Sequence, residues 1–211
     1  MSAALYKVFD VHHEQYEEWF IRNHAAYLSE LLAVRAFLPL NGLGLEIGVG
    51  TGRFAGPLGT DIGLDPSGNM LGYAARKGIS CVQGIAEALP FRNTSFDYCL
   101  IVTTICFVHD AGAALSEAYR VLKKKAPIIL GFVDRVSALG KQYLANKAGS
   151  TFYKNATFYS VAEVRSLLRN AGFSGISEGQ TLSMELEKIN DIEPVRPGSG
   201  SGAFVVIKAG K

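Results

Sequence analysis

A glycine-rich segment near residue 50 has the composition of a turn that binds a nucleotide-type cofactor. Its pattern is E-x-G-x-G-x-G, beginning at Glu46, and its glycines are Gly48, Gly50 and Gly52. Glycines let such a turn bend sharply and approach a ligand without a Cβ in the way. A dinucleotide site has the pattern G-x-G-x-x-G, whose last glycine position holds Arg53 here. We therefore expect a cofactor that places no pyrophosphate over this turn.

Two carboxylates accompany the glycine turn. Asp65 lies 19 positions after Glu46, at the end of the next apolar run. A carboxylate at that place can accept hydrogen bonds from the two ribose hydroxyls and would repel a ribose 2′-phosphate. Glu46 adds negative charge beside the turn, which suits a positively charged ligand group. The two residues predict a ligand with a free ribose and a cationic part.

The elements that must position these residues alternate along the chain between apolar runs and helical patterns. Strands are predicted at 44–47, 61–64, 79–83, 98–103 and 127–133. Helices are predicted at 67–77, 113–123 and 160–170, the last opened by a capping box. This alternation predicts an α/β fold with a Rossmann-like, doubly wound and mostly parallel sheet. Ligands bind such a sheet beyond the carboxyl ends of its strands, where the glycine turn should lie.

The two ends of the chain differ from this core. Residues 14–37 carry aromatic and leucine side chains at helical spacing, with a break near Asn23. Residues 176–182 and 203–208 are strand-like, so we expect an antiparallel edge hairpin, with a surface loop at 194–202. About seven strands in total are expected. The prediction is one domain over 1–211, with an N-terminal helical lid (1–40), a cofactor-binding core (41–182), and a mobile loop with the last strand (183–211).

Composition excludes several classes of protein. The 211 residues are 48% hydrophobic and 19% charged, which is typical of a folded globular protein. The formal net charge of +2 is too small to indicate a nucleic-acid or membrane partner. Cys81, Cys99 and Cys106 have no CxxC spacing, so free thiols and no metal site are expected. Residues 1–11 lack a basic stretch followed by an apolar block, and we expect a cytoplasmic protein without a signal peptide.

Five segments occur in a characteristic order along the chain, at 46–52, 65–67, 84–91, 95–97 and 118–123. Together they resemble the motifs of class I S-adenosylmethionine (SAM)-dependent methyltransferases over roughly residues 40–135. The closest resemblance is to the small-molecule group that includes the ubiquinone-biosynthesis enzymes. It implies SAM as methyl donor, S-adenosylhomocysteine as product, a small-molecule acceptor, and methyl transfer by in-line displacement.

The resemblance also implies a role for each cofactor-binding position. Glu46 and the backbone of Gly48 and Gly50 would face the methionyl part, and Gly52 completes that motif. Further expected contacts are Asp65 at the ribose, Pro66 and Met70 beside the adenine, the Ala86 amide at an adenine ring nitrogen, and Thr103 beneath the sulfonium. Ile85 departs from the family pattern, because relatives often have an aspartate there that accepts the adenine amino group.

The acceptor side falls in the segments that resemble the family least. Tyr16, Trp19 and Phe20 share one helical stripe, and they either belong to the core or contact cofactor or substrate from the lid. Tyr153 either lines a substrate pocket or anchors its loop. His109 follows the fourth strand and is the candidate general base, although His109-Asp110 also resembles a helix start with Asp110 as its cap. Because positioning supplies much of the rate of methyl transfer, a base is needed only when the acceptor must lose a proton.

Other functions stay open at this point. A SAM-binding regulatory or scaffold protein would keep the fold without turnover, and a protein methyltransferase would use the same donor site. The chain has Thr103–Cys106 after the fourth strand instead of an Asn-Pro-Pro-Tyr motif, which argues against methylation of nucleic-acid bases. Arg53 argues against a dinucleotide dehydrogenase.

Overall fold

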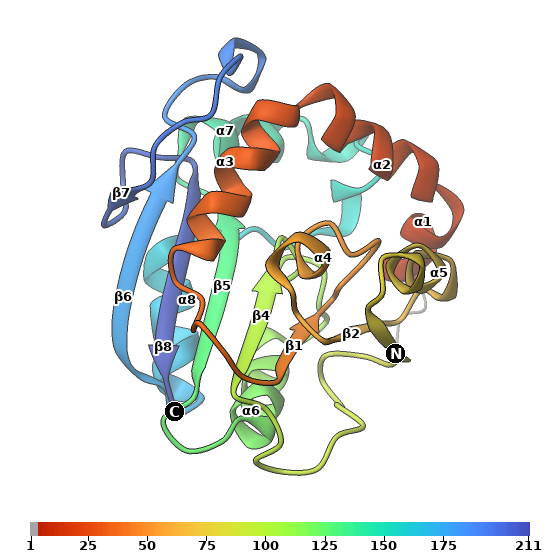
Figure 1. The fold of residues 1–211 in the computed structure, drawn as a ribbon. Coiled ribbons are helices and arrows are strands. Elements are labelled where there is room, and N and C mark those ends of the chain that lie inside the picture. The colour runs from red at the N-terminus through yellow and green to blue at the C-terminus, as the bar shows by residue number, and fades with distance from the viewer. Residues whose placement is uncertain (1–3) are drawn as a thin grey trace.

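An eight-stranded sheet runs through the centre of the protein in a computed structural model that describes residues 4–211 (Figure 1). The strand order is β3-β2-β1-β4-β5-β8-β6-β7. The strands are β1 Gly44–Ile47, β2 Ile62–Asp65, β3 Ser80–Gln83, β4 Tyr98–Val102, β5 Pro127–Val133, β6 Ser174–Thr181, β7 Arg196–Pro197 and β8 Phe204–Gly210. Strands β1 to β5 pair in parallel, as the sequence predicts.

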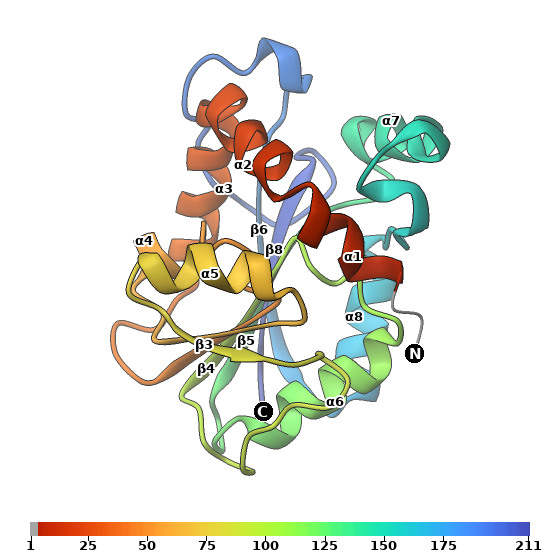
Figure 2. The ribbon, with the colours of Figure 1, turned by 90° about the vertical axis from the view of Figure 1, so that its right-hand side faces the viewer.

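Helices cover both faces of this sheet. They are α1 Ala4–Val11, α2 His13–Arg22, α3 His24–Arg35, α4 Ala55–Leu58, α5 Gly68–Arg76, α6 Ala111–Val121, α7 Ala138–Ala145 and α8 Val161–Asn170. Short 3-10 turns are η1 Lys147–Gly149, η2 Tyr153–Asn155 and η3 Leu186–Lys188. Helices α3, α4 and α5 lie on one side of the sheet, and α6 and α8 lie on the other (Figure 2). The predicted Rossmann-like fold is confirmed.

Strand β4 shows why the sheet is buried on both faces. Cys99 and Ile101 pack into the hydrophobic cluster on the side of α6 and α8. Tyr98, Leu100 and Val102 pack into the cluster on the side of α3. Successive side chains of a strand point to opposite faces, so an uninterrupted apolar run supplies both clusters at once.

The N-terminal helices cross the end of the sheet at which the parallel strands finish (Figure 2). The predicted helical break falls at Asn23, between α2 and α3. Its backbone amide and its side-chain amide both donate to the Trp19 carbonyl oxygen, at 2.9 and 3.0 Å. Helix α1 lies within the predicted helical lid (1–40) but before the helical spacing at 14–37, and residues 1–3 of that lid lie outside the described residues.

The C-terminal strands complete the sheet in the opposite direction. β8 pairs antiparallel with β6, as predicted, and also antiparallel with β5. It therefore lies between these two strands, and the two-residue β7 forms the edge beyond β6. β7 falls within the segment 194–202 that the sequence predicts as a loop. The side chain of Gln180 holds the end of that segment by accepting the amides of Ser201 and Gly202 at 2.8 and 2.7 Å.

Across residues 4–211, no helix combines the length and the apolar character required to cross a membrane.

Candidate active site

The glycine turn after β1 is tightly packed against the loop that follows β4. Gly48 and Gly50 have φ angles of 76° and 51°, in the region that favours glycine. A Cβ at Gly48 would lie 2.1 Å from Cγ2 of Thr104. The Thr104 hydroxyl donates to the Gly48 carbonyl oxygen at 3.1 Å. The two loops are therefore joined, and a larger residue does not fit at Gly48.

Gly52 serves the packing of the turn on its other side. It has a φ of 76°, and a Cβ there would lie 2.5 Å from Cδ1 of Ile79 and 3.3 Å from Cα of Ala74. Gly48 and Gly50 line a large cavity, whereas Gly52 is not among the residues that line it. The structure thus separates the third glycine of the motif from the first two.

Asp65 holds the turn from the end of β2 and lines the same cavity. Its two carboxylate oxygens accept the amides of Gly50 and Ser67, each at 2.9 Å. Burial raises the pKa of Asp65 to about 6, although these two hydrogen bonds act to lower it. Each carboxylate oxygen has capacity for a second hydrogen bond, so Asp65 both fixes the turn and can accept from a ligand.

Glu46 is buried beside the turn with one oxygen unsatisfied. Its Oε2 has no hydrogen-bond partner, and burial raises the pKa of Glu46 to about 8. The side chain does not line the cavity itself. Tyr16 does line it, and its pKa is raised by burial and then by the nearby carboxylates of Glu46 and Asp65. A buried polar atom without a partner is destabilising, so a donor supplied by a ligand would offset that cost.

The loop after β3 supplies the next wall of the cavity. Ile85 and Ala86 line it, together with Pro66 and the buried Met70. The carboxylate of Glu87, in the same loop, accepts the backbone amides of His109 and Asp110 at 2.6 and 3.2 Å. The positions expected around an adenine ring therefore all line the same cavity.

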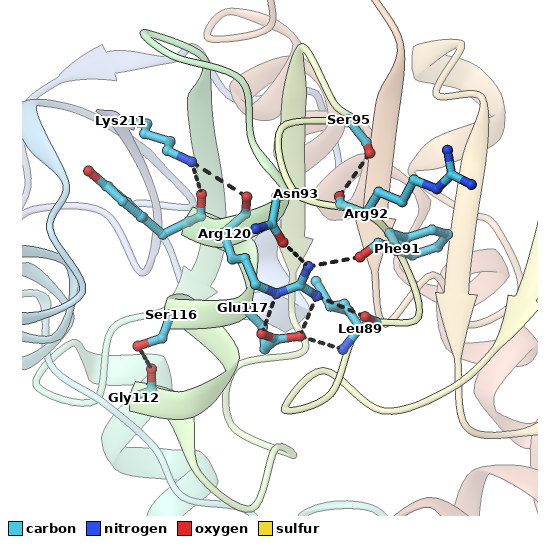
Figure 3. A network of polar contacts seen from close by, with 11 residues as sticks. Leu89, Phe91, Arg92, Asn93, Ser95, Gly112, Ser116, Glu117, Arg120 and Lys211 are labelled. Atoms are coloured by element: carbon cyan, nitrogen blue, oxygen red, sulfur yellow. Dashed lines mark hydrogen bonds and ion pairs between the residues drawn. The ribbon is translucent and has the colours of Figure 1, made fainter.

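Arg120 of α6 fixes this loop through its guanidinium group (Figure 3). Its guanidinium donates to the carbonyl oxygens of Leu89 and Phe91 at 2.9 and 2.8 Å, and to the Asn93 side chain at 2.7 Å. It also forms an ion pair with Glu117 at 2.7 Å, and Glu117 accepts the Leu89 amide at 2.8 Å. These five residues clamp the loop to the helix. Leu89, Phe91 and Arg120 belong to the motif segments 84–91 and 118–123, but no role was predicted for them.

Thr103 and His109 lie in the loop that follows β4, and both line the cavity. Thr103 has a φ of 51°, which is unfavourable for a non-glycine residue and is typical of functional sites. Asp110 caps α6, as expected, by accepting the Ala113 amide at 3.0 Å. In the described part of the chain, no side chain bonds to the His109 imidazole, whereas an established general base is usually oriented by a third group.

The N-terminal helices are joined to the cofactor side by two carboxylates. Glu17 of α2 accepts the Thr51 hydroxyl at 2.5 Å and the Arg53 guanidinium at 3.0 and 2.5 Å. Asp10 of α1 accepts the Ser67 hydroxyl at the N-terminus of α5. Burial alone would raise the pKa of Glu17, but the hydrogen bonds from Arg53 and Thr51 hold it below its usual value.

The predicted aromatic stripe of α2 faces the cavity. Tyr16, Trp19 and Phe20 all line it, and the Tyr16 hydroxyl lies 3.6 Å from where a Cβ of Gly50 would be. Tyr153 lines the cavity from η2. These four residues come from segments far apart in the chain, and only the fold brings them together.

The cavity has a volume of about 990 Å³, at the upper end of the range of small-ligand pockets. Apart from Glu46 and Gly52, every cofactor, lid and base residue named from the sequence lines it. Glu30 of α3 also lines the cavity and was not predicted. The sequence did contain a signal, because Glu30 shares the helical spacing of the apolar residues Ala26 and Ala33, at four residues after one and three before the other. Both alanines are buried in the structure.

Comparisons with known proteins decide the family. A family model described as "Methyltransferase domain" matches residues 45–130. The crystal structure of a SAM-dependent methyltransferase from Thermotoga maritima, described as a possible histamine N-methyltransferase, superposes with a TM-score of 0.96. It is 50% identical, and the match covers 98% of this chain and 100% of that one. The chain belongs to the SAM-dependent methyltransferases.

Two further relatives of the methyltransferase match it over different lengths. An uncharacterised protein of Methanocaldococcus jannaschii is 44% identical over 204 residues, which are 97% of this chain and 98% of that protein. A demethylmenaquinone methyltransferase of Lactococcus lactis is 38% identical over 99 residues, which are 40% of this chain and 39% of that enzyme. The resemblance to the class I small-molecule group, drawn from the five sequence motifs, is confirmed.

Proposed function

We propose that this methyltransferase transfers the methyl group of SAM to a small-molecule acceptor by in-line displacement. The observation that carries this proposal is the single cavity that joins the cofactor positions to a pocket of aromatic side chains. Gly50, Asp65 and Ala86 line one part of it, and Phe152 and Tyr153 line another. Donor and acceptor can therefore meet in one cavity.

The residues present fit SAM. Glu46 does not line the cavity itself, but its unpartnered Oε2 is buried beside the glycine turn and suits the amino group of the methionyl part. The free capacity of Asp65 suits the ribose hydroxyls. The wall that includes Pro66, Met70 and Ala86 suits the flat adenine ring. When bound, SAM supplies a methyl group on a positively charged sulfur, which is an activated leaving group. We assign Gly52 a supporting role, because its close neighbour is Ile79.

The chain's own residues contribute position and the exclusion of water. Thr103, at the end of β4, borders the place where the two substrates would meet. Helices α1 and α2, held by Asp10 and Glu17, cover the cofactor side. Holding two reactants in line removes much of the entropic barrier of a bimolecular step. An enclosed site also strengthens the electrostatic interactions inside it.

The covered cavity favours a small acceptor over a protein chain. A protein substrate would have to insert a side chain between the aromatic residues of α2 and those of η2. A protein that binds SAM without turnover would use the same cofactor positions, so the test must measure transfer as well as binding.

Calorimetry and product analysis together test the proposal. We expect Asp65→Ala and Gly50→Val to weaken SAM binding at least tenfold, with the fold retained by circular dichroism. The matched controls are Asp191→Ala, at an exposed carboxylate, and Gly72→Ala, at a glycine with open space around it. SAM carrying a labelled methyl group, incubated with pooled small metabolites, should give a labelled product. Normal SAM binding by both variants would contradict the assigned cofactor site, and binding without any transfer would favour the regulatory alternative.

A further inference from the structure

Beyond the cofactor positions the cavity continues into an acceptor pocket, defined here by Phe107, Tyr143, Tyr153 and Glu30. The ring of Tyr153 stacks on that of Phe107, with centroids 5.7 Å apart and planes at 12°. It stacks on Tyr143 with centroids 5.0 Å apart and planes at 24°. Phe158 is buried behind these rings. The result is a continuous aromatic wall opposite α3.

Glu30 is the carboxylate of this pocket, and it has no partner. Its side chain is 3% exposed and lines the cavity, and it forms no hydrogen bond or ion pair within residues 4–211. The adjacent Ser29 is used differently, since its hydroxyl accepts the amide of Glu193 at 2.8 Å. Burial raises the pKa of Glu30 to about 8. A buried ionisable group without a partner is destabilising, so its presence in a cavity points to a ligand that pairs with it.

Among the described residues that line the pocket, no buried cation competes for Glu30. The pKa values of four nearby phenols are raised, first by burial and in part by Glu30: Tyr16 of α2, Tyr27 of α3, Tyr143 of α7 and Tyr153 of η2. They stay neutral at physiological pH. Arg22 lines the cavity from α2, but its side chain is 76% exposed and lies 4.0 Å from Glu18. Glu187 of η3 adds a second negative charge near Tyr143.

We propose that the acceptor is a small arylalkyl amine, and that Glu30 binds its ammonium group and takes the proton that the nitrogen must lose. The aromatic wall suits both the aryl group and the cation, because ring faces attract positive charge. This inference rests on the proposed methyl transfer and specifies its substrate class. A neutral alcohol offers no positive charge with which an ionised Glu30 could pair.

The proton balance of the step is simple. The ammonium nitrogen gives one proton to the Glu30 carboxylate, which frees the nitrogen lone pair. That pair forms the new carbon–nitrogen bond while the carbon–sulfur bond of the donor breaks, and the sulfur keeps the bonding electrons. The product leaves as the methylated ammonium ion, and the proton on Glu30 passes to solvent.

The test compares Glu30→Gln with the wild type. Gln has the same shape but neither the charge nor the ability to take a proton. The control is Glu18→Gln, at an exposed residue of α2. The probes are 2-phenylethylamine and the matched alcohol 2-phenylethanol, followed by a panel of arylalkyl amines, with methylated product measured by mass spectrometry. Amine binding to the complex with S-adenosylhomocysteine is measured by calorimetry in two buffers of different ionisation enthalpy.

We expect transfer to the amine with kcat/KM at least 100-fold above that for the alcohol. Glu30→Gln should lose at least 100-fold in kcat/KM for the amine while SAM affinity changes less than twofold. Wild-type protein should release a proton on binding the amine at pH 7, and Glu30→Gln should not. Equal amine binding and methylation by the variant would overturn the inference, as would transfer to alcohols but to none of the amines. If the wild-type protein binds SAM but none of the amines, the inference is overturned and the cofactor site stands. If the wild-type protein does not bind SAM, the proposed function is overturned.

Discussion

The link between α2 and the glycine turn can be tested through Glu17. Its carboxylate accepts three hydrogen bonds, one from Thr51 and two from Arg53. Glu17→Gln removes the negative charge. It also replaces one acceptor oxygen by an amide NH2 group, which is a donor and cannot accept a hydrogen bond from the guanidinium. The control is Glu18→Gln at the neighbouring residue. Glu18 is exposed, and its ion pair with the exposed Arg22 is weak because the two charged groups are 4.0 Å apart. Only the first change should loosen the helix from the turn.

The expected size follows from burial. Hydrogen bonds to charged groups contribute about 1.5–3 kcal/mol, whereas exposed ion pairs contribute about 0–1 kcal/mol. The Arg53 and Glu17 side chains are 24% and 17% exposed, so we place their contribution between these limits, at about 1–2 kcal/mol. That free energy corresponds to about a 5- to 30-fold rise in the population with α2 detached.

Hydrogen exchange followed by mass spectrometry measures this population directly. Amides of α1 and α2 should exchange about 5- to 30-fold faster in Glu17→Gln, and SAM affinity should fall by a similar factor or less. The pKa of Glu17 is held below its usual value, so the link is intact at neutral pH and is lost only as the pH falls through that lowered value. Equal exchange in Glu17→Gln and Glu18→Gln would refute the reasoning.

Further predictions concern the turn, the loop after β3 and the response to pH. Gly48→Ala should lower the free energy of unfolding by about 2–4 kcal/mol in denaturant titrations, because its Cβ would meet Thr104 and its φ is positive. Arg120→Met should speed hydrogen exchange at residues 85–93 and lower the free energy of unfolding by about 1–3 kcal/mol, because the carbonyl groups of Leu89 and Phe91 lose their donor. Faster exchange confined to α6 would contradict this. In ligand-free protein the free energy of unfolding should fall as the pH rises from about 4 to about 6, because folding raises the pKa of Asp65 from 3.8 to about 6. Asp65→Asn should reduce this fall in the free energy of unfolding by at most about 3 kcal/mol. A fall of the same size in the variant would show that the Asp65 carboxyl does not titrate in this way.

The sequence indicated the donor half of the site because its signals are local. Glycines at fixed spacing, an acidic residue near the end of each of the first two strands, and alternating helices and strands all depend on residues close together in the chain. The capping box at Ser160 and Glu163 and the cap at Asp110 are of the same kind, and both are present in the structure. Such features depend on backbone geometry within a few residues, which the local sequence dictates.

The sequence predicted less well where pairing partners are distant. β7 lies in a segment whose Pro, Gly and Ser content is typical of loops, and it forms because β6 offers an open edge. The insertion of β8 between β5 and β6 depends on which edges remain after the parallel strands have paired. Helix α1 has its partner in α5, through Asp10 and Ser67, more than 50 residues away in the chain.

By itself, then, the sequence determined the family, the five parallel strands and the glycine turn with its carboxylates, since each is encoded in short segments. Tertiary structure decided that Gly52 packs against Ile79 while Gly48 and Gly50 face the cavity. It also decided that Glu30 lies opposite a wall of stacked rings from α7, η2 and the loop after β4. The burial and missing partner of a carboxylate depend on everything packed around it, and that information exists only once distant segments have come together.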